Sequence, residues 1–401
     1  IGSTAQCADG ADNDGDKKVF MIDTKIGVIG DKVGCHEINT KILMYDGTIK
    51  MVQDIKLNDL IMGDDSTPRK VLNLCRGNEM MYKISNVKNE SYIVNKKHIL
   101  CLKYSCSKFI GHNKARNRYL VYWFNNKTIK QELKVFSYEN KNKDNVFKKA
   151  NEYLNILIDN LDIEISVFDY LKLPKVIKNN LKGYKVSIKF PETVLPLDPY
   201  MIGFWLGDGH SAAPAITTQD ATVIHYFQKQ LEQYKCYLQF HNNLAYRING
   251  NGRKNKGCNY FLNQLNDLNL INNKHIPYIY KCNSRDNQLK LLAGILDADG
   301  HLDKNGGFEF SQSLEHEQII DDLIYLCRSL GFSCYKNIKK TSWTYKGVKK
   351  YGEAWRICIN GKGIEEIPTL CPRKKANPRQ QIKDVLVSGI TIEKLKTDNY
   401  Y

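Results

Sequence analysis

The sequence predicts a multidomain protein in which an all-β module precedes an α+β domain that contains an internal duplication. Three observations lead to this fold class. The chain has 401 residues, enough for two or three domains of ordinary size. Residues 35–103 alternate short apolar runs with turn residues. Residues 196–375 contain two similar apolar helices that each end in Asp-Gly.

The all-β prediction rests on strand and turn signals in residues 35–103. The apolar run 42–45 leads into Asp46-Gly47, a dipeptide that favours a tight β-hairpin. Residues 52–62 are expected to form a second pair of strands around Asn58-Asp59. Further short strands are expected at residues 71–74, 81–84 and 92–94.

The charge balance indicates an anionic partner. The 59 Lys and Arg residues exceed the 43 Asp and Glu residues, which gives a net charge of +16. Residues 103–150 contain 12 basic and 3 acidic side chains, and residues 335–375 contain 11 and 3. Because basic side chains hold phosphate groups, nucleic acid is the expected partner, and a solvated charged face is the alternative. The candidate DNA-binding residues are Lys114, Arg116, Arg118, Lys340 and Lys350.

Two further segments flank the duplicated domain. Residues 104–195 are predicted to form a basic region that recognises DNA or serves as a linker. Helices are expected in it near residues 145–159 and 166–181. Residues 376–401 show a weak β pattern that is too short to form a domain of its own.

The duplicated helices place two carboxylates in corresponding positions. The first helix begins at Asp198, a good N-cap, and ends at Asp208, while the second ends at Asp299. The glycine after each carboxylate can take a positive φ and stop the helix. If the helices pack side by side, small residues allow a close approach at the seam: Gly203, Gly207, Ala293, Gly294 and Ala298.

The expected meeting of Asp208 and Asp299 has an electrostatic consequence. Two carboxylates at neighbouring helix C-termini repel each other and the helix dipoles. A divalent cation removes this penalty, and Mg²⁺ prefers carboxylate, water and phosphate oxygens. A cation held against a phosphodiester can activate water and stabilise the leaving oxygen. We therefore expect both residues to bind Mg²⁺ and to catalyse phosphodiester hydrolysis.

These helices resemble a known family. Residues 292–300, Leu-Ala-Gly-Ile-Leu-Asp-Ala-Asp-Gly, closely resemble the second signature of LAGLIDADG homing endonucleases, and residues 201–209 resemble the first signature more loosely. Asp208 and Asp299 are 91 residues apart, which suits a single-chain enzyme of two αββαββα halves. The resemblance implies a saddle of antiparallel strands on double-stranded DNA. It also implies a long, asymmetric site, because the halves are unlike.

In this family a lysine supports each active site. Lys274, in the segment 273–277, matches one such lysine, and the second lies in the segment 372–375. The spacing fits Lys374 or Lys375 and does not choose between them, and Lys375 is taken as the catalytic candidate. For each lysine, a surface side chain that only contacts phosphate is the alternative.

The β module carries a second resemblance. Residues 35–47, which begin Cys-His-Glu-Ile-Asn, and residues 52–63 resemble the start of an intein splicing domain of the Hint type. Residues 94–98, Val-Asn-Lys-Lys-His, resemble the later segment whose histidine activates the first peptide bond. The resemblance implies an intein with an inserted homing endonuclease. Its splicing domain would begin with residues 35–103 and resume at 376–401, and the endonuclease would occupy 196–375.

The implied splicing chemistry starts at Cys35 and needs no cofactor. The Cys35 sulfur would attack the Gly34 carbonyl and exchange an amide for a thioester, because a thiolate is a good nucleophile. His98 would protonate the departing amine, and Asn95 would hold the oxyanion or twist the peptide. Taken singly, Cys35 reads as a buried structural thiol and His98 as a core histidine, and their joint placement favours catalysis.

The resemblance also implies features at both ends of the chain. An intein ends in His-Asn followed by Cys, Ser or Thr. Residues 385–401 resemble only the approach to that end, so a separate C-terminal fragment or a truncated chain is expected. Residues 1–34 would be N-extein or cloning-derived sequence. Asp12, Asp14 and Asp16 suit a calcium loop or an acidic turn, and the missing bidentate Glu favours the turn.

The cysteines and the hydropathy bear on the compartment. Twelve scattered cysteines without paired spacing argue against a zinc ribbon and a secreted disulfide framework. The sequence contains no apolar run near the length of a membrane span and no signal peptide. We expect reduced thiols, an intracellular protein of the nucleus or the cytoplasm, and no membrane partner.

Three classes of function remain open. The first is an intein that carries an active homing endonuclease. The second is a splicing or autoprocessing element whose endonuclease domain is inactive and only binds DNA. The loose match of residues 201–209 to the first signature leaves this class open. The third is a transcription regulator with this DNA-binding fold, which would have no use for Cys35 and His98.

Overall fold

The chain folds into two compact units in the computed structural model, and each unit is described by itself. The flanking unit combines the chain up to Gly63 with Thr67–Lys185 and Val387–Tyr401. The inserted unit combines Asp64–Ser66 with Val186–Leu386. The described residues are 9–11, 19–23, 35–88, 90–106, 108–157, 161–251 and 259–401. Gly34 and the acidic residues Asp12, Asp14 and Asp16 lie outside them.

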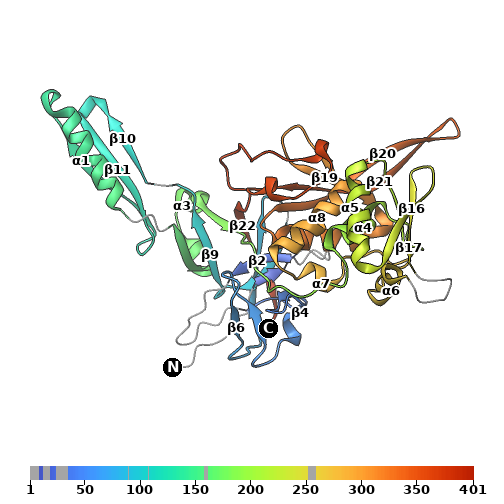
Figure 1. The fold of residues 1–401 in the computed structure, drawn as a ribbon. Coiled ribbons are helices and arrows are strands. Elements are labelled where there is room, and N and C mark those ends of the chain that lie inside the picture. Colours follow the sequence, from blue (N-terminus) through green and yellow to red (C-terminus); the bar gives the residue numbers. More distant parts are fainter. Residues whose placement is uncertain are drawn as a thin grey trace. The chain divides into compact units, whose positions relative to one another are not determined.

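The flanking unit contains three small antiparallel strand pairs (Figure 1). The predicted Asp46-Gly47 turn joins β3 and β4: Gly47 has a φ of +89°, and the Thr48 N–H donates to the Asp46 carboxylate at 2.8 Å. This hairpin is therefore confirmed. The strands of the three pairs are β1 (Asp9–Ala11) with β2 (Val19–Asp23), β3 (Lys41–Leu43) with β4 (Ile49–Met51), and β5 (Leu60–Met62) with β6 (Pro68–Lys70).

The second strand pair expected at residues 52–62 does not form. Val52–Asp54 is a 3-10 helix, and only Leu60–Met62 is a strand. The Val52 N–H donates to the Thr40 carbonyl at 2.7 Å, and the Ile55 N–H donates to the Val52 carbonyl at 3.3 Å. Both side chains are buried in one small core cluster. A single 3-10 turn thus buries two apolar side chains three residues apart, the spacing of a 3-10 helix.

The main sheet of the flanking unit has six strands in the order β13-β9-β14-β22-β7-β8. Strand β22 pairs antiparallel with β7 from Ile390↔Asn86 to Tyr400↔Gly77, so the weak β pattern predicted in the last residues of the chain forms a long strand. The bounds are β7 (Gly77–Asn86), β8 (Ser91–Asn95), β9 (Ile99–Tyr104), β13 (Asp162–Ser166), β14 (Leu181–Tyr184) and β22 (Val387–Tyr400).

Between β9 and β13 the chain forms a small module of three strands and one helix (Figure 1). Helix α1 packs on the sheet around a local core of Tyr119, Val121, Tyr138 and Ala150. The helix expected near residues 145–159 is therefore present. The bounds are β10 (Phe109–Asn113), β11 (Arg118–Asn125), β12 (Lys130–Ser137) and α1 (Lys143–Ile156).

The helix expected near residues 166–181 is divided into α2 (Val167–Lys172) and α3 (Lys175–Asn180). Pro174 explains the break, because proline disfavours helical backbone at the residue before it. Leu173 is extended, with a ψ of 149°, and Pro174 becomes the N-cap of α3.

The inserted unit repeats one order of elements in its two halves. The first half has a sheet in the order β15-β17-β16, and an isolated bridge joins Gly209 to Ile216. Its bounds are α4 (Pro199–Asp208), β15 (Ala215–Thr217), α5 (Ala221–Leu231), β16 (Cys236–Asn242), β17 (Ala245–Gly250), α6 (Tyr260–Asp267) and α7 (Tyr278–Lys281).

The second half has a four-stranded sheet in the order β18-β19-β21-β20. Both halves share the order helix, strands, helix, two strands, as the duplication predicted. The expected αββαββα pattern is complete in neither half: the first half has one strand and an isolated bridge between its first two helices, and the second half ends in 3-10 turns instead of an α-helix. The bounds are α8 (Arg285–Asp299), β18 (His301–Leu302), β19 (Phe308–Ser313), α9 (Glu317–Ser329), β20 (Ser333–Tyr345) and β21 (Val348–Asn360).

Short 3-10 helices complete the described secondary structure. Besides Val52–Asp54, they are Lys114–Arg116, Asn140–Asn142, Glu232–Tyr234, Leu314–His316, Ile364–Glu366 and Pro372–Lys374. No helix among the described residues has the length and apolar composition needed to cross a bilayer. The ten cysteines of the described chain are present as thiols.

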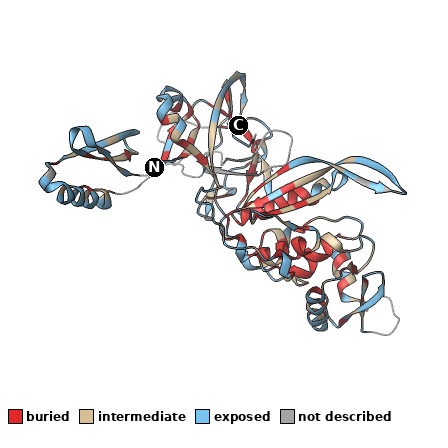
Figure 2. Ribbon diagram, turned by 90° about the horizontal axis from the view of Figure 1, so that it is seen from above, coloured by how far each residue is buried: buried red, intermediate tan, exposed pale blue. Residues whose placement is uncertain are grey.

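Helices α4 and α8 form the centre of the inserted unit. Both belong to one large core cluster, and Figure 2 shows buried residues concentrated along the helices of this unit. A Cβ on Gly203 would overlap the Leu291 carbonyl oxygen, and a Cβ on Gly294 would overlap the Tyr200 carbonyl oxygen. The glycines therefore allow backbone-to-backbone contact at the seam, which confirms the close approach that the sequence predicts.

Candidate functional site

The seam between α4 and α8 brings Asp208 and Asp299 together. They are the last residues of the two helices, and a Cβ on Gly207 would lie 3.4 Å from the Asp299 carboxylate. The following glycines, Gly209 and Gly300, were expected to adopt positive φ, but both are extended, with φ of −83° and −77°. A Cβ on either glycine would overlap the last turn of its own helix, so the absence of a side chain, rather than φ, explains the residue.

The two carboxylates influence each other electrostatically. Displacement of water by protein atoms and, second, the charge of Asp299 raise the pKa of Asp208 to about 6, while Lys374 and Lys274 oppose the shift. The pKa of Asp299 is raised by the same loss of water and lowered by the two lysines. The Asp299 side chain is exposed at the surface.

Lys274 lies at the end of the first acidic helix. Its Nζ donates to the carbonyls of Gly207 at 3.0 Å and Gly209 at 2.7 Å. Partial burial lowers the pKa of Lys274 to about 8, against the opposing charges of Asp299 and Asp208. The predicted lysine is therefore placed beside both carboxylates, where it also caps the negative end of the helix dipole.

The second lysine of the site is Lys374 rather than Lys375. The buried Lys374 Nζ donates to the carbonyls of Leu296 at 2.9 Å, Asp297 at 2.7 Å and Ala298 at 3.1 Å, all in the last turn of α8. Lys375 is exposed. The contacts of Lys374 with the end of α8 therefore favour Lys374 over Lys375 as the second candidate lysine.

The donor set at the helix ends fits a divalent cation. The described residues contain no group of three or more His, Cys, Asp and Glu side chains suited to hold a metal ion. A cation would therefore rest on Asp208 and Asp299, with water and phosphate oxygens completing its shell. The mutual repulsion that raises the pKa of Asp208 is the penalty that such a cation relieves.

The candidate DNA-binding cations are exposed in both units. In the inserted unit, Lys340 and Lys350 lie on the hairpin of β20 and β21, whose strands have 13 residues each. In the flanking unit, Lys114, Arg116 and Arg118 surround the tight turn between β10 and β11. Each group presents positive charge at an edge of a small sheet, as phosphate contacts require.

A second site lies in the flanking unit around Cys35. The Cys35 N–H donates to the Asn95 side-chain oxygen at 3.2 Å, and the Asn95 N–H donates to the Cys35 carbonyl at 3.0 Å. His98 follows in the same segment and is 3% exposed. Burial and the charge of His36 hold the pKa of His98 well below its ordinary value. The structure thus brings Cys35 and Asn95 into direct contact.

The sequence analysis did not identify His36 as part of this site. The His36 and His98 rings pack edge to face with centroids 4.7 Å apart, and His36 is fully buried. Its backbone also exchanges hydrogen bonds with Tyr401, at 3.0 and 2.9 Å, which joins the end of β22 to the segment that carries Cys35. The position of His36 next to Cys35 in the chain was the only available signal.

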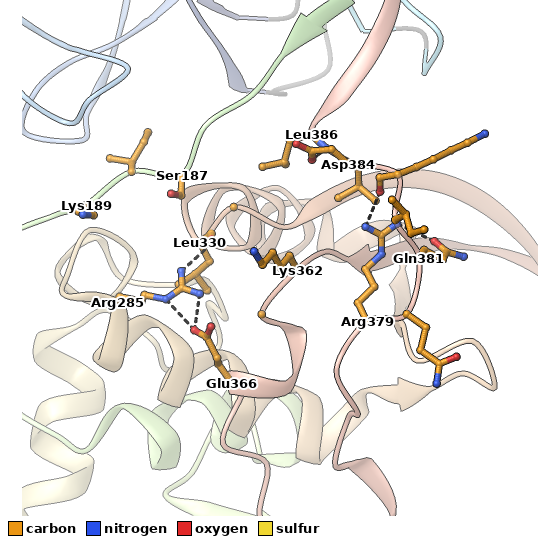
Figure 3. Close-up of a pocket in the computed structure, with 17 residues that line it drawn as sticks. Ser187, Lys189, Arg285, Leu330, Lys362, Glu366, Arg379, Gln381, Asp384 and Leu386 are labelled. Atoms are coloured by element: carbon orange, nitrogen blue, oxygen red, sulfur yellow. Dashed lines mark hydrogen bonds and ion pairs between the residues drawn. The ribbon is translucent and has the colours of Figure 1, made fainter. Parts of the chain in front are cut away.

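A separate cavity of about 840 Å³ lies within the inserted unit (Figure 3). Arg285, the first residue of α8, lies at its wall and donates to the Glu366 carboxylate at 2.8 Å and to the Leu330 carbonyl at 2.8 Å. Asp299 is at the opposite end of α8, roughly 20 Å away at the usual rise per residue. The cavity is therefore not part of the acidic site.

Comparisons with known families match both units. Residues 35–186 match the model described as Hom_end-associated Hint, and residues 283–384 match the model described as Homing endonuclease. The first range includes the whole Cys35 site, and the second includes Asp299 and Lys374. Asp208 and Lys274 lie outside both ranges, so their assignment rests on the geometry above.

Similar proteins include a replicative DNA helicase DnaB of Mycobacterium intracellulare, which is 29% identical over 38% of this chain and 22% of the relative. The catalytic subunit of the V-type proton ATPase of Candida tropicalis is 23% identical over 92% of this chain and 42% of the relative. The homothallic switching endonuclease of Saccharomyces cerevisiae is 22% identical over 74% and 63%, respectively. The chain thus spans less than two thirds of each relative.

One solved structure, of mesophilic variants of the homing endonuclease I-DmoI, is 14% identical with a TM-score of 0.28 and covers 41% of this chain and 83% of that chain. The two family matches fall on the two places where the fold gathers reactive groups, the Cys35 site and the acidic helix ends. The chain therefore resembles an intein in which one segment matches a Hint family and another matches a homing endonuclease family.

Proposed function

We propose that the inserted unit is a Mg²⁺-dependent endonuclease that cuts both strands of double-stranded DNA at a long, asymmetric site. We also propose that the flanking unit performs the first step of protein splicing at the Gly34–Cys35 bond. The observation that carries the first proposal is the arrangement at the α4–α8 seam. Two carboxylates meet there, and each acidic helix end is capped by its own lysine.

The residues at the seam have separate tasks in the proposed hydrolysis. Asp208 and Asp299 would hold the cation between the two DNA strands, and Mg²⁺, when bound, would activate water and stabilise the leaving oxygen. Lys274 and Lys374 add positive charge beside the scissile phosphates. The pKa of Lys274, about 8, suits proton exchange near neutral pH.

DNA would be held by the sheets and by the exposed cations around them. Lys340 and Lys350 extend the basic surface of the inserted unit along the hairpin of β20 and β21. Lys114, Arg116 and Arg118 would add contacts from the flanking unit. Because phosphate contacts release counterions, replacing the last three by alanine should weaken binding at all sequences and flatten its salt dependence.

A randomised library of double-stranded DNA tests the nuclease. The full chain with Mg²⁺ should linearise a small set of related sequences that share a long site, and a sample with EDTA should linearise none. Binding of selected sequences without cleavage at any Mg²⁺ concentration would instead favour the alternative, a splicing element with an inactive endonuclease. This alternative has a specific basis: Asp208 and Lys274 lie outside the residues that match the homing endonuclease model.

The splicing proposal rests on the contact between Cys35 and Asn95. The Asn95 side-chain oxygen accepts the N–H of Cys35, which is the amide of the bond to be exchanged. That hydrogen bond orients the peptide while the Cys35 sulfur attacks the Gly34 carbonyl and forms the thioester. His98 of this segment would take the proton from the Cys35 thiol as the sulfur attacks and pass it to the Cys35 nitrogen as the amide bond breaks, so that no net proton is consumed.

A thiol-cleavage assay tests the splicing step. Incubation of the full chain with a strong thiol in Mg²⁺-free buffer should release residues 1–34 as a thioester-derived fragment. The Cys35→Ala variant should release nothing, and Asn95→Ala should slow release strongly. Equal release from wild type and Cys35→Ala would show that the cleavage does not pass through the Cys35 thioester. A transcription regulator would show no release from any variant.

The relatives support an inserted element. A helicase and part of a proton ATPase have unrelated activities, yet each shares a stretch with this chain that covers less than half of its own length. A self-splicing segment that resides in different host proteins would produce this pattern.

A further inference from the structure

The lysines that cap the acidic helices lie on segments that need support of their own. Lys374 ends a 3-10 turn of three residues, and Lys274 precedes Ile276 and Pro277 in a stretch without secondary structure. Such segments have few backbone hydrogen bonds of their own. A displacement of about 1 Å can cost a catalytic group roughly 100-fold in rate. Side chains that fix these two backbones are therefore candidates for positioning residues.

Asp297 fixes the backbone of the Lys374 segment. Its carboxylate is 2% exposed and accepts three hydrogen bonds: from the Leu370 N–H at 2.5 Å, from the Cys371 N–H at 3.3 Å and from the Tyr200 hydroxyl at 2.8 Å. A buried carboxylate is tolerated only with such donors. Because Tyr200 belongs to α4, the same carboxylate also joins the two acidic helices.

Asp322 performs the corresponding task for the Lys274 segment. It lies on α9, is 3% exposed and accepts the Ile276 N–H at 3.0 Å, two residues after Lys274. Its second oxygen accepts from the Lys281 ammonium at 2.6 Å, which pairs the charge. The Lys274 segment belongs to the first half of the unit, whereas Asp322 belongs to the second half.

The asymmetry between the halves follows from the sequence of α4. Counting back two residues from the terminal carboxylate gives Asp297 in α8 but Leu206 in α4. Leucine has no acceptor, so the first helix cannot hold its own lysine segment in the way that α8 does. The second half supplies the missing carboxylate across the unit, through Asp322.

We propose that Asp297 and Asp322 are the positioning residues of the two endonuclease sites, with Asp297 serving the Lys374 site and Asp322 serving the Lys274 site. The assignment of each aspartate to one DNA strand rests on the proposed nuclease activity. The claim that each aspartate fixes the backbone of one lysine segment does not depend on that activity. If each lysine assists the cut in one DNA strand, each aspartate controls the rate on one strand only.

Strand-resolved kinetics test this assignment. The substrate is a supercoiled plasmid that carries a site recovered from the randomised library, and the cut in each strand is timed separately with Mg²⁺. Lys374→Met identifies the strand that Lys374 serves. Asp297→Asn should then slow that same strand by roughly 10- to 100-fold and give nicked plasmid, because an amide can accept at one oxygen only. Asp322→Asn should nick the opposite strand.

A matched control comes from the neighbouring position on α9. Asp321 is buried like Asp322, but it accepts from the Lys336 ammonium at 3.1 Å instead of holding the Lys274 segment. Asp321→Asn should therefore slow both strands alike, or neither. Equal slowing of both strands by Asp297→Asn and by Asp322→Asn would overturn the proposal, since it would indicate a general loss of structure.

Amide hydrogen exchange of the full chain without Mg²⁺ provides a readout that needs no nuclease activity. Asp297→Asn should lose protection in the peptide that contains Leu370 and Cys371, with the peptide around Ile276 unchanged. Asp322→Asn should do the reverse. If wild type cuts no DNA, the proposed function fails, and this exchange pattern still decides the positioning roles. Unchanged protection at residues 370 and 371 in Asp297→Asn would refute them.

Discussion

At the residue scale, the carboxylates at the helix ends lower the stability of the folded protein, although the proposed cleavage requires them. The pKa of Asp208 is raised to about 6, first by loss of water and then by Asp299, so its ionised form is disfavoured in the folded state at neutral pH. Groups that oppose folding yet persist at the end of a buried seam are characteristic of functional sites. The same logic applies with a lesser shift to Asp299.

Asp208→Asn should therefore abolish cleavage and stabilise the metal-free protein. Removal of the charge relieves the repulsion from Asp299, so we expect a higher melting temperature for the variant at pH 7.5 in EDTA. Saturating Mg²⁺ should remove that advantage, because bound cation stabilises only the wild type. Calorimetry with and without Mg²⁺ measures both effects, and Asp267→Asn, at an exposed residue of α6 outside the seam, serves as a comparison. A variant that melts below wild type in EDTA would contradict the electrostatic explanation.

The pH dependence has a definite sign. Because the folded pKa of Asp208 lies above its unfolded value, this residue stabilises the fold at low pH, and the contribution is lost as the pH rises through about 6. The single-turnover cleavage rate should move the other way and rise through the same range, because only the ionised carboxylate holds Mg²⁺. Rates between pH 5 and pH 8 at a fixed, sub-saturating Mg²⁺ concentration check this, because Mg²⁺ and the proton compete for the carboxylate, and a flat profile there would argue against Asp208 as a ligand.

The two adjacent lysines make a matched pair. Lys374→Met should reduce cleavage of one strand by roughly 100-fold or more, since its ammonium is held at the end of α8 next to the carboxylates. Lys375→Met should stay close to wild type in cleavage, because its side chain is exposed. A strand-resolved plasmid assay measures both. The reverse ranking would restore Lys375 as the catalytic candidate.

At the element scale, backbone contact between α4 and α8 sets where the carboxylates meet. Gly203 and Gly294 oppose each other across the seam, and neither position has room for a methyl group. The helices are buried on nearly all sides, so the usual division into apolar and polar faces is lost. The spacing of small residues therefore takes the place of amphipathic pattern as the packing signal.

Gly294→Ala should test this contact. The added Cβ would overlap the Tyr200 carbonyl and force the helices apart, so we expect a loss of about 2–4 kcal/mol in the free energy of unfolding and a larger proportional loss of cleavage. Gly306→Ala is the control, because no atom lies within 4 Å of its Cβ position. Its positive φ should cost about 1 kcal/mol. Urea unfolding distinguishes the two, and equal effects would show that the seam tolerates separation.

At the scale of the whole molecule, the inserted unit leaves and re-enters the flanking unit at one place. Tyr184 and Val387 are direct partners in the antiparallel pairing of β14 with β22. Partners in such a pair have Cα atoms about 5 Å apart, a gap that a two-residue turn can close. Insertion at this position therefore leaves the six-stranded sheet intact.

Replacement of residues 186–386 by Asn-Gly, which together with Lys185 makes a three-residue turn between Tyr184 and Val387, should leave the flanking unit folded. The shortened chain should keep the circular-dichroism signature of its sheet and the thiol-dependent release of residues 1–34, and it should lose Mg²⁺-dependent cleavage. The same replacement in the Cys35→Ala background is the control for release. An unfolded product would mean that the flanking sheet depends on the inserted unit, contrary to the pairing of β22 with β7 and β14.

The sequence by itself determined the features that are local in the chain. The two helices that end in Asp208 and Asp299, their small residues and the Asp46-Gly47 hairpin follow from spacing and turn chemistry within a few residues. The pairing of Cys35 with Asn95 followed from resemblance to segments of a known family. These predictions succeeded because each depends on contacts within one element or on a complete sequence motif.

Only the tertiary structure decided the features that depend on direction in space. The choice of Lys374 over Lys375 depends on which of the two side chains contacts the end of α8. The turn at Val52 depends on which backbone groups find partners far along the chain. Asp297 and Asp322 differ from ordinary buried carboxylates only because they accept hydrogen bonds from N–H groups that are far away in the sequence. The sequence specifies which donors and acceptors are present. Which of them form long-range hydrogen bonds depends on where the fold places them in space.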